Sequence, residues 1–103
     1  MISVGILGAS GFVGAELLRI CAAHSEFEVV YATGDTQAGS LASSLYPSLT
    51  TAYPNLIFDE YSLEKTLNCD VVFLALPHEA SLQIVPEIIN KFDLLLIAVQ
   101  LFV

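Results

Sequence analysis

The sequence predicts an α/β fold, a doubly wound parallel sheet with helices on both faces. Short apolar runs rich in β-branched residues alternate along the chain with stretches of helical periodicity. A glycine-rich segment joins the first apolar run to the first helical stretch. Hydrophobic residues make up 55% of the 103 residues and charged residues only 14%, which suits strands that are buried on both sides.

The first strand, helix and second strand are predicted near the start of the chain. Ile2–Leu7 is an apolar run, and Phe27–Thr33 is β-branched and aromatic, so both are expected to be strands. The stretch from Gly11 to about His24 is expected to be a helix. Its apolar residues recur at helical spacing: Val13, Leu17, Leu18 and Cys21.

The middle of the chain is predicted to hold little regular structure. Gly34–Gly39 has the composition of a loop, and Ser40–Tyr46 is expected to be a short helix that Pro47 ends. Residues 48–55 are polar and are expected to be irregular. Leu56–Phe58 is expected to be a short third strand.

The last third of the chain returns to alternating strands and helices. Ser62–Leu67 is expected to be a short helix whose first residue is its cap. Asp70–Leu76 is a continuous apolar run and predicts a fully buried strand. A helix is expected over about residues 80–90, with Pro86 kinking it or marking a restart, and a final strand from Leu94 onward.

The segment Gly8–Gly14 has the spacing G-x-x-G-x-x-G, a variant of the commoner G-x-G-x-x-G. A strand, a glycine-rich turn and a helix N-terminus are together what a nucleotide pyrophosphate needs, because backbone N–H groups and the helix dipole bind phosphate. Gly8 allows the tight turn, Gly11 the close approach of the ligand, and Gly14 the packing of helix on strand. The alternative is a tight glycine-rich turn without a ligand.

In an open parallel sheet, ligands bind outside the carboxyl ends of the strands. Four segments are expected to meet there. They are the glycine-rich loop, residues 33–35, the turn after Phe58, and residues 77–79.

Two side chains at this edge are candidates for ligand contact. Asp35 lies close to the position of the acidic residue that binds the ribose 2′-hydroxyl in dinucleotide sites, which favours NAD because a carboxylate repels the 2′-phosphate of NADP. The alternative for Asp35 is a loop aspartate that caps its own turn. His78 is expected either to contact the nicotinamide side or a substrate group, or to start a helix with its ring bonded to a nearby carbonyl.

The charge balance excludes some partners. The formal net charge is −8, with three basic residues in the whole chain: Arg19, Lys65 and Lys91. We therefore expect neither nucleic-acid nor membrane binding, and an anionic ligand has to be held by backbone amides. No secretory signal is visible, and the terminal apolar run of residues 94–103 is about half as long as a spanning helix, so a cytoplasmic protein is expected.

The two cysteines, Cys21 and Cys69, have no metal-binding spacing and are expected to be buried apolar residues. No metal site is therefore predicted. The sequence also lacks a Cys–His or Ser–His–Asp arrangement with an activated nucleophile. The chain is expected to bind a cofactor without completing a reaction.

Two segments, Gly8–Arg19 and Asp70–His78, closely resemble the start of N-acetyl-gamma-glutamyl-phosphate reductase, which belongs with the aspartate-semialdehyde dehydrogenases. The run Ala75–His78 and the pair Ala38–Gly39 favour the glutamyl-phosphate member. The resemblance covers about residues 1–92 and implies a Rossmann-like NAD(P)-binding domain. It also implies an arginine-biosynthesis enzyme that reduces N-acetylglutamyl 5-phosphate to the semialdehyde with NADPH, releasing phosphate through a cysteine thioester.

By position, the resemblance implies that six residues hold the cofactor pyrophosphate: Gly8, Ser10, Gly11, Phe12, Val13 and Gly14. Thr33 and Gly34 would lie near the adenosine ribose, and Pro77 and His78 near the nicotinamide. The family's nucleophilic cysteine and acid–base histidine belong to a later catalytic domain, which this chain is expected to lack. We therefore expect no catalytic residue and no activity in the chain alone. For the full-length family, the resemblance implies a small-molecule substrate and a homo-oligomer.

The chain departs from the family pattern at three places. Asp35 lies where the 2′-phosphate is expected, so NADP is implied while NAD stays open, and Glu79 replaces a usual glycine. Residues 93–103 form an atypical apolar tail, for which we hypothesise a frameshift near Asp93 that the nucleotide sequence would test. The alternatives are a fragment of aspartate-semialdehyde dehydrogenase and a nucleotide-binding module without catalysis.

Overall fold

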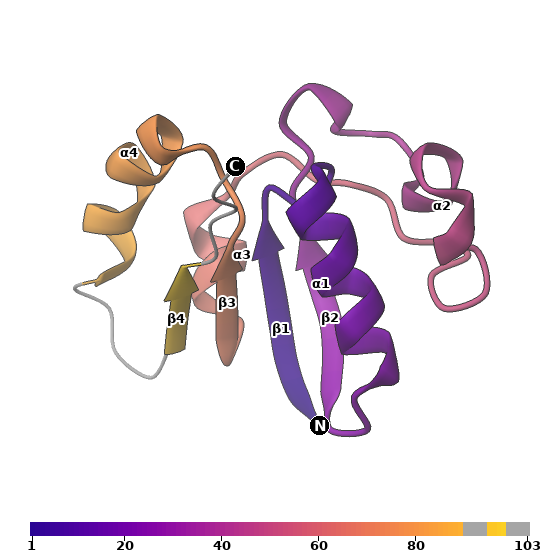
Figure 1. The fold of residues 1–103 in the computed structure, drawn as a ribbon. Coiled ribbons are helices and arrows are strands. Elements are labelled where there is room, and N and C mark those ends of the chain that lie inside the picture. Colours follow the sequence, from indigo (N-terminus) through magenta and orange to yellow (C-terminus); the bar gives the residue numbers. More distant parts are fainter. Residues whose placement is uncertain (90–94, 99–103) are drawn as a thin grey trace.

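The computed structural model describes residues 1–89 and 95–98 and contains one parallel sheet (Figure 1). Its four strands lie in the order β2-β1-β3-β4, and every neighbouring pair is parallel. The strands are β1 (Ile2–Leu7), β2 (Phe27–Ala32), β3 (Val71–Leu74) and β4 (Leu95–Ala98). The fold class predicted from the sequence is therefore confirmed.

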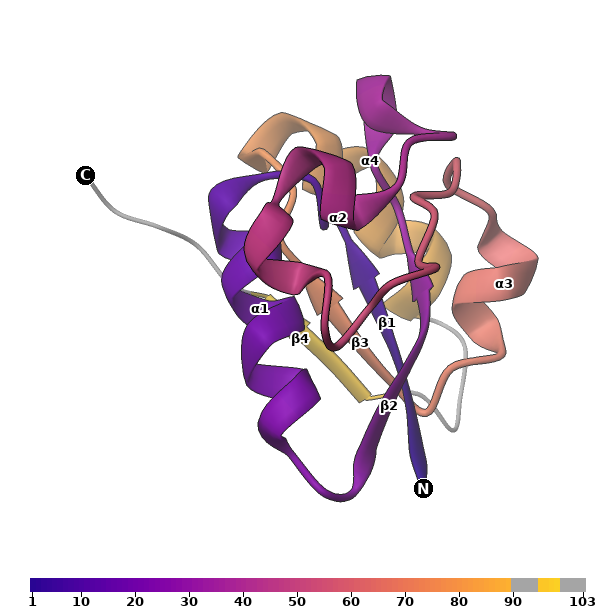
Figure 2. The ribbon, with the colours of Figure 1, turned by 90° about the vertical axis from the view of Figure 1, so that its right-hand side faces the viewer.

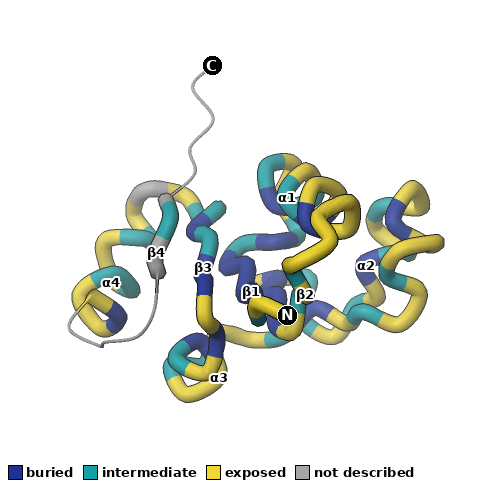
Figure 3. Tube along the Cα trace, turned by 90° about the horizontal axis from the view of Figure 1, so that it is seen from below, coloured by how far each residue is buried: buried dark blue, intermediate teal, exposed yellow. Residues whose placement is uncertain are grey.

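Helices cover both faces of this sheet. α1 (Phe12–Ala23) packs on one face, over β1 and β2, whereas α3 (Leu63–Leu67) and α4 (His78–Ile89) lie on the opposite face (Figures 1 and 3). Figure 2 looks along the sheet from its β2 edge, with α1 and α3 on opposite sides. α2 (Ala42–Leu45) lies outside β2, and two 3₁₀ turns, η1 (Asp35–Gln37) and η2 (Pro47–Leu49), complete the described elements.

The core has one layer on each face of the sheet, because successive side chains of a strand point to opposite sides. The layer beneath α1 is built from buried residues of β1 and α1, among them Ile6 and Leu18. The layer beneath α3 and α4 includes Leu7, Val72 and Ile88, all almost fully buried. Both layers together hold the strand ends in place beneath the loops.

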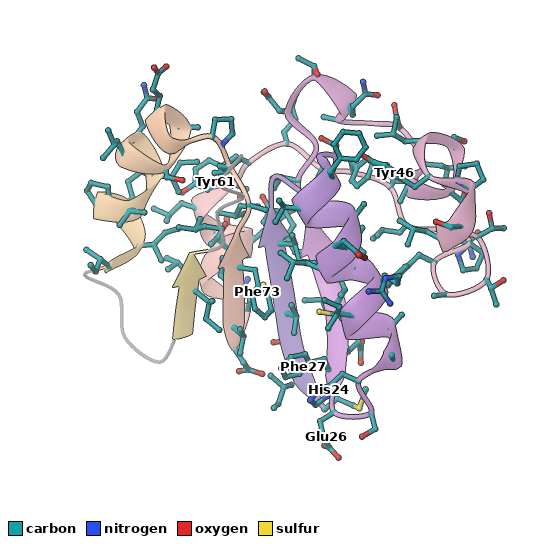
Figure 4. The ribbon with its side chains drawn as sticks, in the orientation of Figure 1. His24, Glu26, Phe27, Tyr46, Tyr61 and Phe73 are labelled. Carbon is teal, nitrogen blue, oxygen red and sulfur yellow. The ribbon has the colours of Figure 1, made fainter. Side chains whose placement is uncertain are left out.

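Both cysteines are buried in these layers, as predicted, and burial raises the pKa of the Cys21 and Cys69 thiols. His24 follows α1 at the sheet edge opposite the strands' carboxyl ends, where its ring stacks on Phe27 at 4.0 Å (Figure 4). Its Nδ1 accepts a hydrogen bond from the Glu26 amide at 3.1 Å. His24 therefore stabilises the turn into β2.

The prediction of a strand over Leu56–Phe58 is wrong. This segment makes only an isolated antiparallel bridge between Leu41 and Ile57, and the backbone of Phe58 bonds to Gly39 and Ser40 at 2.8 and 2.9 Å. The loop after η1 therefore takes the hydrogen bonds that a neighbouring strand would have provided.

Two expectations for α4 also need correction. The helix begins at His78 instead of Ala80, because the Ser81 amide already bonds to the Pro77 carbonyl at 3.1 Å. It continues through Pro86 without a restart. Pro86 has no N–H group to donate to the carbonyl of Leu82, four residues earlier, and Leu82 is an exposed residue. Of the tail expected from residue 93, only β4 is described, and 90–94 and 99–103 lie outside the described residues.

Candidate functional site

A cleft of about 500 Å³ lies outside the carboxyl ends of β1, β2 and β3. The four segments expected at this edge all contribute to its lining. The lining residues are Leu7, Gly8, Ser10, Gly11, Thr33, Gly34, Asp35, Thr36, Glu60, Tyr61, Ala75, Leu76, Pro77, Ala80 and Ile84. This is the place at which an open parallel sheet binds its ligand.

The three glycines of the Gly8–Gly14 loop differ in what the fold requires of them. Gly8 has a φ of +86°, and a Cβ there would lie 2.6 Å from the Ala75 carbonyl oxygen. A Cβ on Gly14 would lie 2.4 Å from the Ala9 Cα, so α1 can approach this loop only with glycine at that position. A Cβ on Gly11 would meet its nearest atom at 3.8 Å, which is ordinary contact. The fold therefore has room for a side chain at Gly11.

The glycine-rich loop is tied to the end of β2. The Gly8 amide donates to Thr33 Oγ1 at 2.9 Å, and the Ala9 amide donates to the Thr33 carbonyl at 2.8 Å. Ser10 Oγ donates to the Gly34 carbonyl at 3.1 Å. Because the amides of Gly8 and Ala9 are already bonded to Thr33, they are not donors for a ligand. Thr33 and Gly34 thus have a structural role that the sequence did not reveal.

The N-terminus of α1 is open where the loop enters the helix. Gly11 is the N-cap, has no side chain to cap the helix, and lines the cleft. Among the described residues, no acceptor bonds to the amides of Phe12 or Val13, and the first turn contains no acidic residue. Because Gly11 lines the cleft, the positive end of the α1 dipole lies beside it. Phe12 is 80% exposed, and neither Phe12 nor Val13 is among the residues that line the cleft.

A second contact supports this loop from the other side. The Tyr46 hydroxyl, from the residue that follows α2, donates to the Ser10 carbonyl at 2.6 Å (Figure 4). Sequence reasoning missed this contact, since nothing local links two residues 36 positions apart. The Ser10 backbone is therefore held by groups from two distant segments.

The end of β2 presents polar groups to the cleft. Thr33 is buried, and a Cβ on Gly34 would lie 2.6 Å from Phe58 Cβ, so packing requires glycine there. Asp35 is exposed and has a φ of +49°, in the left-handed region that aspartate and asparagine tolerate better than most residues. Asp35 and the neighbouring Thr36 line the cleft.

The end of β3 presents an apolar wall. Leu76 and Pro77 line the cleft, and so do Ala80 and Ile84 on α4, which sequence reasoning missed. Their signal was the helical spacing of residues 80 and 84, which puts both on one face of α4. The side chain of His78 lies outside the described part of the structure, so its predicted contact stays a prediction.

The cleft has no basic side chain among its described lining residues, while Asp35 and Glu60 are acidic. Arg19 pairs with Glu16 at 2.6 Å, and Lys65 pairs with Asp59 at 3.1 Å. Within residues 1–89 and 95–98, no group of three or more metal-ligating side chains is found. An anion in this cleft would be bound by backbone amides.

The sequence that forms this loop, helix end and sheet matches a known family. A family model described as "Semialdehyde dehydrogenase, NAD binding domain" matches residues 3–96. The chain belongs to this family. N-acetyl-gamma-glutamyl-phosphate reductase of Saccharophagus degradans is 45% identical over 90 residues, covering 87% of this chain and 26% of that protein.

One further relative and one solved structure are also similar to this chain. The [LysW]-L-2-aminoadipate/[LysW]-L-glutamate phosphate reductase of Sulfurisphaera tokodaii is 43% identical over 91 residues, covering 87% of this chain and 26% of that protein. The crystal structure of aspartate semialdehyde dehydrogenase with NADP from Candida albicans superposes with a TM-score of 0.79 at 22% identity. It covers 95% of this chain and 29% of that one, and shows the shared fold. The chain spans about a quarter of the length of the curated relatives it matches.

The predicted resemblance to N-acetyl-gamma-glutamyl-phosphate reductase is thus confirmed. So is the assignment to an oxidoreductase family with a nucleotide-binding domain. Among the helices that the structure describes, none combines the length and apolar character needed to cross a bilayer.

Proposed function

We propose that this chain is the cofactor-binding part of an NADP-dependent reductase that converts N-acetylglutamyl 5-phosphate to the 5-semialdehyde in arginine biosynthesis. The observation that carries the proposal is the open α1 N-terminus beside a cleft at the strand ends. The 45% identity to N-acetyl-gamma-glutamyl-phosphate reductases supports the choice of substrate. The whole enzyme is proposed to be a cytoplasmic homo-oligomer acting on a small molecule.

The residues of the glycine-rich loop divide into two groups in this proposal. The amides of Phe12 and Val13 donate to the cofactor pyrophosphate, and Gly11 lets the phosphates come close. Gly8 and Gly14 act through the backbone shape that packing requires. Their contribution to binding is to hold the donors at the mouth of the cleft.

The two ends of the cleft take the two halves of the cofactor. Thr33 and Gly34 lie on the side of the adenosine ribose, and Pro77 and His78 on the side of the nicotinamide. When bound, the cofactor would supply a hydride for reduction of the substrate's acyl carbon. No residue of this chain is assigned to catalysis, so the chain's role is to bind and orient the cofactor.

The specific relatives leave a second substrate class open. The phosphate reductase named for LysW-linked aminoadipate and glutamate is 43% identical, close to the value for the N-acetylglutamyl enzymes. Both names describe reduction of a phosphorylated carboxylate. The cofactor half of the proposal is the same for either substrate.

A fluorescence titration of the chain with NADPH and with NADH tests the cofactor proposal. We expect bound reduced cofactor to show enhanced emission, and Gly11→Ala to weaken binding about tenfold because a methyl group occupies the phosphate position. Ser44→Ala, at an exposed position of α2 away from the cleft, should bind like the unmodified chain. Absence of binding of either cofactor at millimolar concentration would contradict the proposal.

A further inference from the structure

The segment after Phe58 joins the outer edge of β2 just before it reaches the cleft. The Asp59 amide donates to the Ala32 carbonyl at 2.8 Å, and the Gly34 amide donates to the Asp59 carbonyl at 3.0 Å. Thr33 and Asp59 also form an isolated parallel bridge. The backbone at residue 59 is therefore fixed to the carboxyl end of β2.

The next residues are held by one side chain of β2. The Tyr31 hydroxyl donates to the Glu60 carbonyl at 2.8 Å and accepts a hydrogen bond from the Ser62 amide at 2.7 Å. These two bonds lie on either side of Tyr61. The Tyr61 backbone is consequently positioned on both sides, although the segment has no regular secondary structure.

The Tyr61 side chain is held at its far end as well. Its hydroxyl donates to Glu87 Oε2, on α4, at 2.9 Å (Figure 4). Burial, followed by the bond to Glu87, raises the pKa of Tyr61 to about 12, so the hydroxyl remains a donor at neutral pH. Tyr61 therefore connects the end of β2 to α4, is 36% exposed, and is one of the residues that line the cleft.

The surroundings of Tyr61 suit a flat, weakly polar group. Leu76, Ala80 and Ile84 line the same cleft and are apolar. Polar groups also line the cleft: the glycine-rich loop, Asp35, and Glu60, which directly precedes Tyr61. Such a mixed lining fits a ligand with a charged bridge and an aromatic ring system.

We propose that the Tyr61 ring is the stacking surface for the adenine base of the cofactor, with Glu87 positioning the ring. This inference rests on the proposed function, because it needs a dinucleotide in the cleft. The choice of adenine follows from the strand order. Tyr61 is tied to the end of β2, where Asp35 marks the ribose of the adenosine half, whereas the nicotinamide side lies at the end of β3.

Binding of the two halves of the cofactor tests this assignment. The ¹⁵N-labelled chain is titrated with ADP-ribose and, separately, with reduced nicotinamide mononucleotide, followed by NMR. We expect Tyr61→Ala to weaken ADP-ribose binding about tenfold, the typical effect of losing a base-stacking ring, and to change mononucleotide binding less than about twofold. Tyr61→Leu, which keeps apolar bulk, should show the same selective loss if Tyr61→Ala does not fold.

Conservative variants separate the ring from its positioning bond. Tyr61→Phe keeps the stacking face, so its affinity for ADP-ribose should fall about threefold or less. Glu87→Gln keeps an acceptor oxygen for the Tyr61 hydroxyl and should bind ADP-ribose like the unmodified chain. Glu87→Ala removes that acceptor, so its ADP-ribose affinity should fall by about as much as that of Tyr61→Phe. Unchanged ADP-ribose affinity in Tyr61→Ala and Tyr61→Leu, or a larger loss for the mononucleotide, overturns the inference alone. Failure of the unmodified chain to bind NADPH, NADH or ADP-ribose overturns the proposed function itself.

Discussion

The helices α1 and α4 both begin at the carboxyl edge of the sheet and both border the cleft, but their N-termini are built differently (Figure 1). α1 starts after a glycine-rich loop and has no acidic residue in its first turn. α4 starts directly after Pro77 and has Glu79 in its first turn. The helix dipole of α4 therefore already has a negative partner, whereas that of α1 does not.

This difference in charge between the first turns of α1 and α4 indicates which of the two helix ends favours an anion. A parallel sheet places several positive helix ends at one edge, so topology alone does not choose among them. The side chains of the first turn make the choice, because a carboxylate near one helix end disfavours a second anion there. The phosphates are accordingly expected at α1 and the less charged parts of the cofactor beside α4.

The largest effect is expected from disrupting the packing of α1 against the glycine-rich loop. In Gly14→Ala, the new methyl group would lie 2.4 Å from the Ala9 Cα, a backbone atom that cannot move aside. We expect the free energy of unfolding in urea to fall by about 3 kcal/mol. Gly11→Ala is the matched control, with its nearest contact at 3.8 Å, and should change stability by less than about 1 kcal/mol. Equal stability of the two variants would show that α1 is not packed as described.

The next effect concerns charge at the two helix ends. Phe12→Glu places a carboxylate at the exposed first position of α1 and should weaken NADPH binding about tenfold at low ionic strength. The loss should diminish as salt is added, since salt screens exposed charges. Phe12→Gln, nearly the same size without the charge, separates the electrostatic effect from loss of the ring.

The reciprocal change sharpens the same comparison. Glu79→Gln removes the negative partner of α4 and should alter cofactor affinity by less than about twofold. If Glu79→Gln improves NADPH binding more than Phe12→Glu weakens it, the phosphates lie at α4 instead of α1. Titration of both variants under one buffer condition decides between the two helix ends.

A smaller shift is expected in the choice between NADP and NAD. Asp35→Asn removes a negative charge where the 2′-phosphate would lie, and asparagine tolerates the φ of +49°. We expect the NADPH affinity to rise about fivefold relative to NADH. Glu28→Gln, an equal charge change at an exposed position of β2, should leave the ratio unchanged. The same shift in both variants would mean that net charge alone controls the ratio.

The smallest effect lies at the opposite edge of the sheet. The Ser3 amide and then the Ser3 hydroxyl, each 3.0 Å from Asp70 Oδ2, lower the pKa of Asp70 below its ordinary value of 3.8. A depressed folded-state pKa means that the ionised carboxylate stabilises the fold above about pH 4, and that this contribution is lost as the pH falls further. In urea denaturation, the stability gap to Asp70→Asn should close below pH 4, while NADPH affinity at pH 7 stays unchanged. A gap that is constant with pH would contradict this role for Asp70.

The parts of the site that could be predicted from the sequence are those that depend on residues close to one another along the chain. The strand before Gly8, the helix after Gly11 and the packing role of Gly14 all follow from local periodicity and from missing side chains. The expected strand Leu56–Phe58 failed because its apolar residues satisfy the local pattern, while its hydrogen-bond partner is a loop. Local pattern predicts that a segment is extended but does not identify its neighbour.

The parallel α/β fold, the glycine-rich turn and the family could all be predicted from the sequence, because the patterns that indicate them involve residues a few positions apart. The hydrogen bonds that position the site became visible only in the folded chain. Thr33 accepts from two amides of the glycine-rich loop, the Tyr46 hydroxyl donates to the Ser10 carbonyl, and the Tyr61 hydroxyl donates to Glu87. Those contacts join residues about 25 to 36 positions apart, and their partners are chosen by how the layers pack. The sequence specifies the donors and acceptors of the chain. Which donor bonds to which acceptor is fixed only when the sheet and its helices have packed together.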